Sequence, residues 1–167
     1  MSMIWMQHDT PIGAMILAGD TAGLAGAWLV GQAHFDGIRP DWREDVHASL
    51  LRDTAAQLDE WFAGTRREFD LPLAPRGTPF QHAVWHEIAR VGYGETRDYG
   101  SVAKALGKPS AARAVGAATG RNPLTIIVPC HRLVGRSGAL TGYAGGLSRK
   151  QALLAFESQG RPISIAA

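Results

Sequence analysis

A proline-rich stretch near the middle of the chain, residues 71–77 (LPLAPRG), separates two segments that are organised differently. Proline fixes its own φ and carries no backbone N–H, so it is excluded from the interior of helices and of central strands. The stretch therefore predicts a linker. A chain of 167 residues can form one domain or two small ones. We expect an α+β chain with two units, residues 1–75 and residues 76–167.

The first unit is predicted to be a small sheet with one helix. Short apolar runs at residues 3–7, 14–18 and 24–30 are separated by turn-forming residues, which is typical of an antiparallel meander. Apolar residues between positions 46 and 62 recur at helical spacing, and Gly64 follows where a helix C-terminal cap is expected. Nothing in this unit indicates catalysis.

The second unit is predicted to be mostly helical. Residues 78–81 combine a capping Thr, a Pro at the first helical position and a Gln three residues after the cap. Two more helices are expected over residues 99–106 and 111–119, with Ser110 capping the latter. Two helices joined by a short turn form the helix-turn-helix pattern, although many helical hairpins share it.

Charge is distributed unevenly between the two segments. Residues 1–75 hold 5 Lys and Arg against 11 Asp and Glu, a net charge of −6, whereas residues 76–167 hold 12 against 4, a net charge of +8. The second unit is therefore expected to meet a polyanion, although a dipolar surface between two packed halves would give the same pattern. Its second predicted helix surrounds one long cation, Arg113, with small residues, which favours nucleic-acid docking over plain helix packing; they include Ala112, Ala114 and Gly116.

Cys130 is the sole cysteine, so the chain can form neither an internal disulfide nor a thiolate-rich zinc site. A lone cysteine is usually a small core residue. Here a β-branched run, residues 125–128, predicts a buried strand leading to Cys130, and His131 and Arg132 follow directly. Such neighbours lower the pKa of a thiol, which favours a nucleophile.

Geometry limits how the thiol and the imidazole can meet. On an extended strand, Cys130 and His131 point to opposite faces, so they need a turn or a bridging water to interact. A third group would have to orient the imidazole. Glu157, on a helix that Ser148 is expected to start, is the best candidate, although a carboxylate at such a position is ordinarily solvated.

No apolar run is long enough to span a membrane, and the first residues show no signal-peptide pattern. We therefore expect a cytoplasmic protein that does not bind membranes, in a reducing compartment where the thiol survives.

Three motifs in order resemble the O6-alkylguanine-DNA alkyltransferases across residues 78–160: ARAVGAATGRNP at 112–123, IIVPCHR at 126–132 and TGYAGG at 141–146. The resemblance implies a ribonuclease-H-like first unit that serves as support and a winged helix-turn-helix second unit. It implies a partner, double-stranded DNA carrying O6-alkylguanine, bound through the minor groove. The damaged base is flipped out, and its alkyl group passes irreversibly to the protein in a single turnover, with neither cofactor nor metal. A monomer that can cluster on DNA is expected.

The resemblance also implies roles for individual residues. Cys130 matches the alkyl acceptor, His131 the base that acts on it through water, and Glu157 the carboxylate that orients the histidine. Asn122 matches the residue that braces the cysteine loop. Tyr99 matches the tyrosine that meets the target base and its phosphate and donates a proton to guanine N3.

Further residues match the DNA-binding and pocket elements of the family. Arg113 matches the finger that replaces the extruded nucleotide in the base stack, on a helix face with Ala112, Ala114 and Gly116. The expected base pocket is lined by Val128, Pro129, Tyr143, Ala144, Gly145 and Gly146.

Two positions depart from the family pattern. Ala144 stands where some members have Ser, which removes a side-chain hydrogen bond to the base. Asp98 precedes Tyr99 where a neutral residue is frequent, and a carboxylate there weakens DNA binding unless it is paired.

Three rival interpretations remain open at this point. A cysteine hydrolase would turn over repeatedly. A protein that only flags damaged DNA would need no acceptor cysteine, so the presence of Cys130 favours repair over this alternative. A plain winged-helix module would be indifferent to replacement of Cys130.

Overall fold

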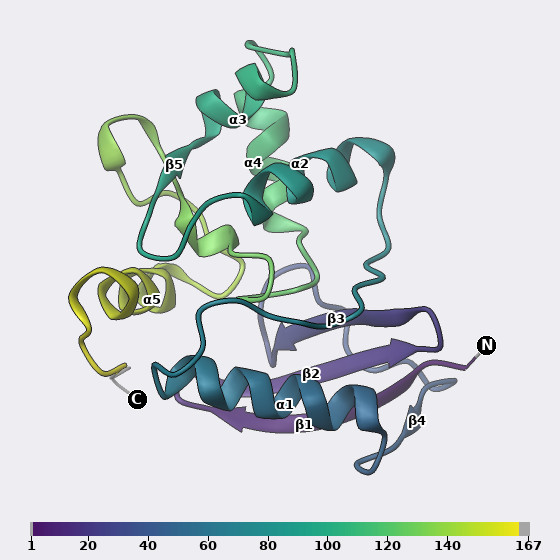
Figure 1. Cartoon of the computed structure of the whole chain (residues 1–167). Coiled ribbons are helices and arrows are strands. Elements are labelled where there is room, and N and C mark those ends of the chain that lie inside the picture. Colours follow the sequence, from purple (N-terminus) through teal and green to yellow (C-terminus); the bar gives the residue numbers. More distant parts are fainter. Residues whose placement is uncertain (1, 164–167) are drawn as a thin grey trace. The chain divides into compact units, whose positions relative to one another are not determined.

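The computed structural model describes residues 2–163, which form two compact units (Figure 1). The first unit contains the chain up to Arg76 together with Pro123–Ile127, and the second contains Gly77–Asn122 and the chain from Val128 onward. The expected boundary did not include this excursion of residues 123–127 into the first unit. The predicted α+β class is confirmed.

The first unit is built on a four-stranded sheet with the order β3-β2-β1-β4. Strands β1 (Ile4–Thr10), β2 (Gly13–Asp20) and β3 (Gly23–Leu29) form the predicted antiparallel meander, and the short β4 (Arg43–Glu44) pairs in parallel with β1. Both tight turns end in a glycine at positive φ, Gly13 at 123° and Gly23 at 141°, a conformation that other residues rarely adopt.

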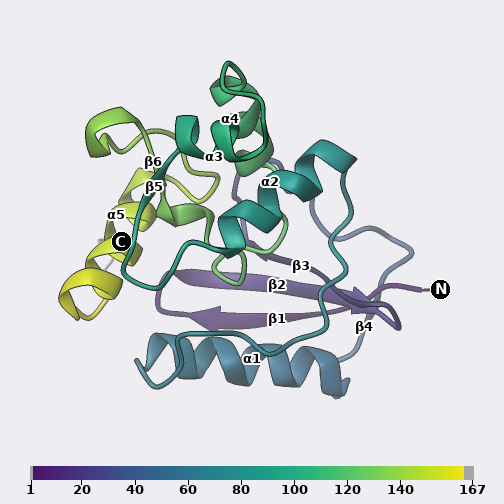
Figure 2. The same cartoon turned by 45° about the horizontal axis from the view of Figure 1, so that its top comes forward.

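Helix α1 (Ser49–Phe62) lies along one face of this sheet (Figure 2). Its buried side chains recur at helical spacing and are Leu51, Thr54, Ala55, Leu58 and Trp61. Gly64 adopts a φ of 80° and donates its N–H to the Trp61 carbonyl, so the predicted helix end is confirmed. The predicted start is wrong, because Val46 precedes the helix and is exposed.

The proline-rich stretch is only partly a linker. The Pro72 carbonyl accepts a hydrogen bond from Leu24 N–H at 2.7 Å, and Ala74 N–H donates to the Leu24 carbonyl at 2.8 Å. Residues 72–74 therefore add a strand-like bridge to the edge of β3, which the sequence pattern did not indicate.

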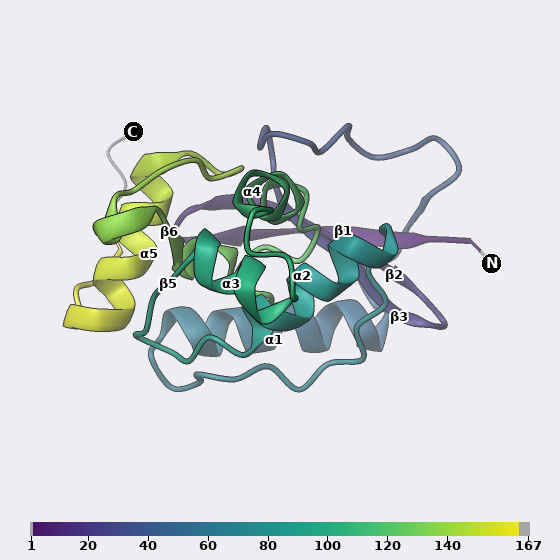
Figure 3. The same ribbon diagram turned by 90° about the horizontal axis from the view of Figure 1, so that it is seen from above.

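In the second unit, α2 (Pro79–Ala89), α3 (Tyr99–Ala105) and α4 (Ala112–Gly120) pack together, as Figure 3 shows. Helix α2 carries the predicted capping box, and the indole N–H of Trp85 on α2 donates to the Ala118 carbonyl on α4 at 2.9 Å. The expected cap of α4 is wrong: Ala111, not Ser110, is the N-cap residue, and it makes no side-chain bond.

The other elements of the second unit are short strands, 3₁₀ turns and the last helix. Strands β5 (Arg97–Asp98) and β6 (Leu133–Val134) pair in parallel, and the 3₁₀ turn η1 (Cys130–Arg132) leads directly into β6. A second 3₁₀ turn, η2 (Arg136–Gly138), precedes α5 (Leu147–Gln159). Helix α5 begins after Gly146 without a side-chain cap, so the predicted cap at Ser148 is wrong.

The strand predicted over residues 125–128 is also wrong. Ile126 has a φ of 73°, so the chain turns there instead of extending, and an isolated bridge, not a strand, joins Leu124 to Ala27. A β-branched residue in this conformation is strained and persists only where its surroundings hold it. Hydrogen bonds from Ala27 N–H to the Pro123 carbonyl and from Thr125 N–H to the Ala27 carbonyl fix the segment within the first unit.

No helix within residues 2–163 has the length and apolar character needed to cross a membrane.

A glycine in the sheet offers a test of packing. A Cβ added to Gly26 would lie 1.9 Å from the Trp28 ring, which stacks on Phe35 at 4.7 Å between centroids. We expect Gly26→Ala to destabilise the protein by about 1–3 kcal/mol, because the indole must leave its stack. The matched control is Gly116→Ala, where the nearest atom is 4.0 Å away and alanine favours the helix. Urea unfolding of both variants measures the difference, and equal midpoints would contradict it.

Candidate active site

The site begins at a turn that brings three consecutive polar side chains into the interior. Cys130, His131 and Arg132 form η1 and are 5%, 0% and 6% exposed. Because the chain turns here, the opposite-face geometry expected of an extended strand does not apply. The thiol and the imidazole therefore start from the same turn.

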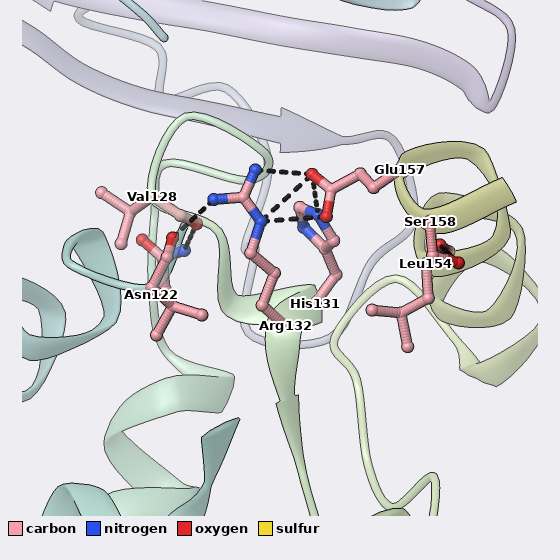
Figure 4. Close-up of polar contacts among 8 residues, drawn as sticks. Asn122, Val128, His131, Arg132, Leu154, Glu157 and Ser158 are labelled. Carbon is pink, nitrogen blue, oxygen red and sulfur yellow. Dashed lines mark hydrogen bonds and ion pairs between the residues drawn. The ribbon is translucent and has the colours of Figure 1, made fainter. Parts of the chain in front are cut away.

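Glu157 on α5 completes the cluster (Figure 4). Its Oε2 lies 3.0 Å from His131 Nε2, and the Arg132 guanidinium donates from Nε to Oε1 at 2.9 Å and from Nη2 to Oε2 at 2.6 Å. The Glu157 side chain is fully buried, so it is not the solvated carboxylate that its position in the helix suggested. A carboxylate can be buried in this way only because it is paired.

Burial and pairing set the protonation states in this cluster. Burial raises the pKa of Glu157, but hydrogen bonds and charges from His131 and Arg132 outweigh it, so the pKa lies below its ordinary value. Burial lowers the pKa of His131, and the opposing effect of Glu157 does not reverse this. Near neutral pH the cluster therefore holds a carboxylate and a neutral imidazole.

The thiol of Cys130 is not activated in the way that its sequence neighbours suggested. Burial raises its pKa above the ordinary value, and the Asn122 side chain, the Lys150 charge and the Tyr143 side chain only partly oppose this. The cation that favours the thiolate is thus Lys150, while the guanidinium of Arg132 is engaged by Glu157. At neutral pH the thiol is protonated and needs a base.

Lys150 is a residue that sequence reasoning missed. It is fully buried on α5, and its Nζ donates to the carbonyls of Thr141 at 2.9 Å and Gly142 at 3.2 Å and to the Tyr99 hydroxyl at 3.5 Å. Burial lowers its pKa. One signal could have found it: Lys150 and Glu157 are seven residues apart, two helical turns, and so share the buried face of α5.

Asn122 closes the loop that precedes the cysteine. Its Nδ2 donates to the Val128 carbonyl at 2.9 Å, and both residues are buried. Pro129 follows, buried as well, and leads into η1. The structure thus places Asn122, Val128 and Pro129 in the segment that leads to Cys130.

Tyr99 is the first residue of α3, and its hydroxyl donates to the Thr141 carbonyl at 3.3 Å. The preceding Asp98 caps the helix: its carboxylate accepts hydrogen bonds from Ser101 N–H at 2.8 Å and from the Ser101 hydroxyl at 2.9 Å. These bonds lower the pKa of Asp98. The carboxylate of Asp98 therefore keeps its negative charge, and as the helix cap it holds the start of α3 and Tyr99 in place.

The loop before α5 brings Tyr143 to the thiol. The Tyr143 hydroxyl is buried, and burial together with the nearby Cys130 raises its pKa well above the ordinary value. Gly146 adopts a φ of 91° and donates its N–H to the Tyr143 carbonyl, and the Gly145 carbonyl accepts from Arg149. Ala144 is half-buried between them.

The predicted DNA-binding residues on α4 are not part of this cluster. Arg113 and Ala114 are exposed, and Ala112 and Gly116 are half-buried. Among the residues that the structure describes, Arg113 makes no hydrogen bond or ion pair, so its charge is available to a ligand.

Across residues 2–163, no group of three His, Cys, Asp or Glu side chains is arranged to hold a metal ion.

Comparisons with known proteins match both units. Residues 3–75 match the ribonuclease-like domain of 6-O-methylguanine DNA methyltransferase, and residues 79–159 match the DNA binding domain of the same protein family. A methylated-DNA–protein-cysteine methyltransferase of Mycolicibacterium paratuberculosis is 47% identical over 157 residues, 94% of this chain and 93% of the relative. One from Methanosarcina acetivorans is 45% identical over 156 residues, 93% of this chain and 98% of the relative.

The fold is also similar to that of a solved structure. The crystal structure of Mycobacterium tuberculosis OGT in complex with DNA has a TM-score of 0.86 and 44% identity to this chain, covering 97% of this chain and 96% of that one. The family models cover most of both units, and the relatives are similar over nearly their full length. Both findings agree with the motifs around Cys130. The chain therefore belongs to the 6-O-methylguanine DNA methyltransferase family.

Proposed function

We propose that this protein repairs DNA by moving the alkyl group of O6-alkylguanine onto Sγ of its own Cys130, once per molecule. The observation that carries the proposal is the cluster in which a buried thiol and a neutral imidazole share one turn, with the imidazole held by a buried carboxylate. The relatives are named for this cysteine methyl transfer, which supports the same assignment here.

The protonation states suggest the order of events. His131, with Nε2 hydrogen-bonded to Glu157, accepts the thiol proton at Nδ1 through a water. The Cys130 thiolate attacks the alkyl carbon, an S–C bond forms, and the bond from that carbon to O6 breaks with its electron pair leaving on guanine. Tyr99 donates a proton to guanine N3, so the leaving group departs neutral. The product thioether is not cleaved by water, which limits each molecule to one event.

Lys150 contributes charge to this step. Its ammonium favours the thiolate of Cys130 and contacts the Tyr99 hydroxyl, so it stabilises negative charge on either atom. Asn122 holds the loop before the thiol, and Val128, Pro129 and residues 143–146 line the base pocket in this proposal.

The partner that we propose is duplex DNA, bound through its minor groove by α3 and α4. The exposed, small-residue face of α4 allows close approach, and Arg113 is free to enter the base stack when the target nucleotide flips out. The net charge of +8 on residues 76–167 supports phosphate contacts. The related OGT of M. tuberculosis was crystallised with DNA.

We place the protein in the cytoplasm, acting as a monomer. The reaction consumes a free thiol, and Cys130 is an unpaired cysteine, so a reducing compartment preserves activity.

Intact mass after incubation with excess duplex carrying O6-methylguanine tests the proposed reaction directly. We expect each molecule to gain one methylene, mapped to Cys130, and no gain in the Cys130→Ser variant. Repeated turnover without a stable adduct would indicate a cysteine hydrolase. Lesion binding with unchanged mass would indicate a protein that only recognises damage.

The role of Arg113 predicts a difference between two substrates. Arg113→Ala should slow repair of duplex DNA by about 10- to 100-fold, because base flipping costs a few kcal/mol and loses its stabilisation. Reaction with free O6-benzylguanine should be unchanged. Arg121→Ala is the matched control, since it removes the same charge at the end of the same helix. Equal losses on both substrates, or equal losses in both variants, would contradict insertion of Arg113.

The Lys150 charge predicts a shift in thiol reactivity. Lys150→Met should raise the pKa of Cys130 further, so the thiolate fraction at pH 7 falls and reaction with O6-benzylguanine slows. Rates measured from pH 6 to pH 10 should show the thiol limb displaced to higher pH, whereas Lys104→Met, which removes an exposed charge on α3, should not move it. A coincident limb in Lys150→Met and the unmodified protein would remove this role.

A further inference from the structure

Arg132 is a buried charge that the proposed chemistry does not use. Its Nε and Nη2 donate to Glu157, its Nη1 donates to the Val91 carbonyl at 2.7 Å, and its guanidinium carbon lies 5.6 Å from the centre of the Tyr93 ring. The guanidinium is thus held on several sides and does not move freely. Any role of Arg132 therefore comes from its fixed position and its charge.

The carboxylate that orients His131 is the same one that binds Arg132. Oε2 of Glu157 accepts from Arg132 Nη2 at 2.6 Å and Nε at 3.1 Å, and lies 3.0 Å from His131 Nε2 (Figure 4). The shortest of these contacts belongs to the guanidinium. Charge-assisted bonds of this kind are the stronger ones, so the negative charge of Glu157 is balanced chiefly by Arg132.

The contact that Glu157 shares between Arg132 and His131 affects the protonation state of the imidazole. A buried carboxylate whose only partner is an imidazole favours the imidazolium, since an opposite charge stabilises the charged form. An imidazolium has hydrogens on both nitrogens and cannot accept the thiol proton. His131 would then already be protonated before the reaction starts.

We propose that Arg132 is a positioning residue that keeps the base of this site available: its guanidinium pairs with Glu157, so that His131 remains a neutral imidazole with its hydrogen on Nε2 and its lone pair on Nδ1. The inference rests on the proposed function, in which His131 takes the proton of Cys130. It gives Arg132 a task distinct from a direct effect on the thiol.

The other charged groups around His131 agree with this task. Glu157 and Lys150 face it from α5, and Arg132 and Cys130 belong to its own turn. Burial lowers the pKa of His131, the Glu157 bond and charge raise it, and the charges of Arg132 and Lys150 lower it again. Removing Arg132 therefore removes one of the effects that keep the imidazole neutral.

The first test uses the unmodified protein and needs no alkyl transfer. Nitrogen-15 NMR of the His131 ring between pH 5.5 and 8 should show the neutral Nε2–H form throughout, with no titration near the usual value of about 6.5. A ring that titrates there, or that is an imidazolium at pH 7, would overturn the proposal. Because this readout is independent of repair, failure of the proposed function leaves it interpretable.

The second test compares variants that separate charge from shape. Arg132→Gln should raise the pKa of His131 by about one unit or more, and the acid limb of the reaction with O6-benzylguanine should move to higher pH by the same amount. Arg132→Lys keeps the charge and should restore most of the original pH profile. The double variant Arg132→Gln with Glu157→Gln removes both charges and should return the imidazole to the neutral form.

A purely structural role makes the opposite prediction. It would lower the melting temperature of Arg132→Gln and Arg132→Lys alike while leaving the His131 titration of the folded protein unchanged, and that result would falsify the proposal. If Arg132→Gln does not fold, the comparison of Arg132→Lys, the double variant and the unmodified protein carries the test.

Discussion

The buried carboxylate of Glu157 is the interaction on which the site depends. It accepts from the guanidinium of Arg132 and contacts His131, and both donors come from the turn that also carries Cys130. A buried ion is tolerated only when its charge and lone pairs are satisfied, so α5 and η1 must meet in this one arrangement. The pairing therefore fixes the turn, and the turn fixes where the thiol lies.

The protonation pattern follows from the same burial. Desolvation raises the pKa of Cys130 and lowers that of His131, so both are neutral at rest. Moving the thiol proton to the imidazole then creates a thiolate and an imidazolium inside a cluster that already balances Glu157 with Arg132. Lys150 adds a positive charge on the thiol side. The thiol in such a site is ionised only when its proton moves to the imidazole. This suits a nucleophile that reacts once with a bound substrate better than a permanent thiolate would.

Local signals in the sequence predicted much of the fold. The meander, the capping box of α2 and the end of α1 at Gly64 were correct, because turns, caps and left-handed glycines depend on neighbouring residues. The failures have other causes. Residues 125–128 have strand propensity but turn at Ile126, since hydrogen bonds to β3, about a hundred residues earlier, hold them there. The caps expected at Ser110 and Ser148 were wrong because a capping residue is only one of several ways to begin a helix.

The sequence by itself determined the family, and it predicted Cys130 as the reactive thiol together with the residues around it, because short motifs carry both residue type and spacing. Only the tertiary structure decided which charge acts on which atom. Arg132 is two residues from the thiol in sequence yet binds Glu157, while Lys150, twenty residues away, is the cation that favours the thiolate. Electrostatic effects depend on distance and burial in space, and neither can be read from separation along the chain.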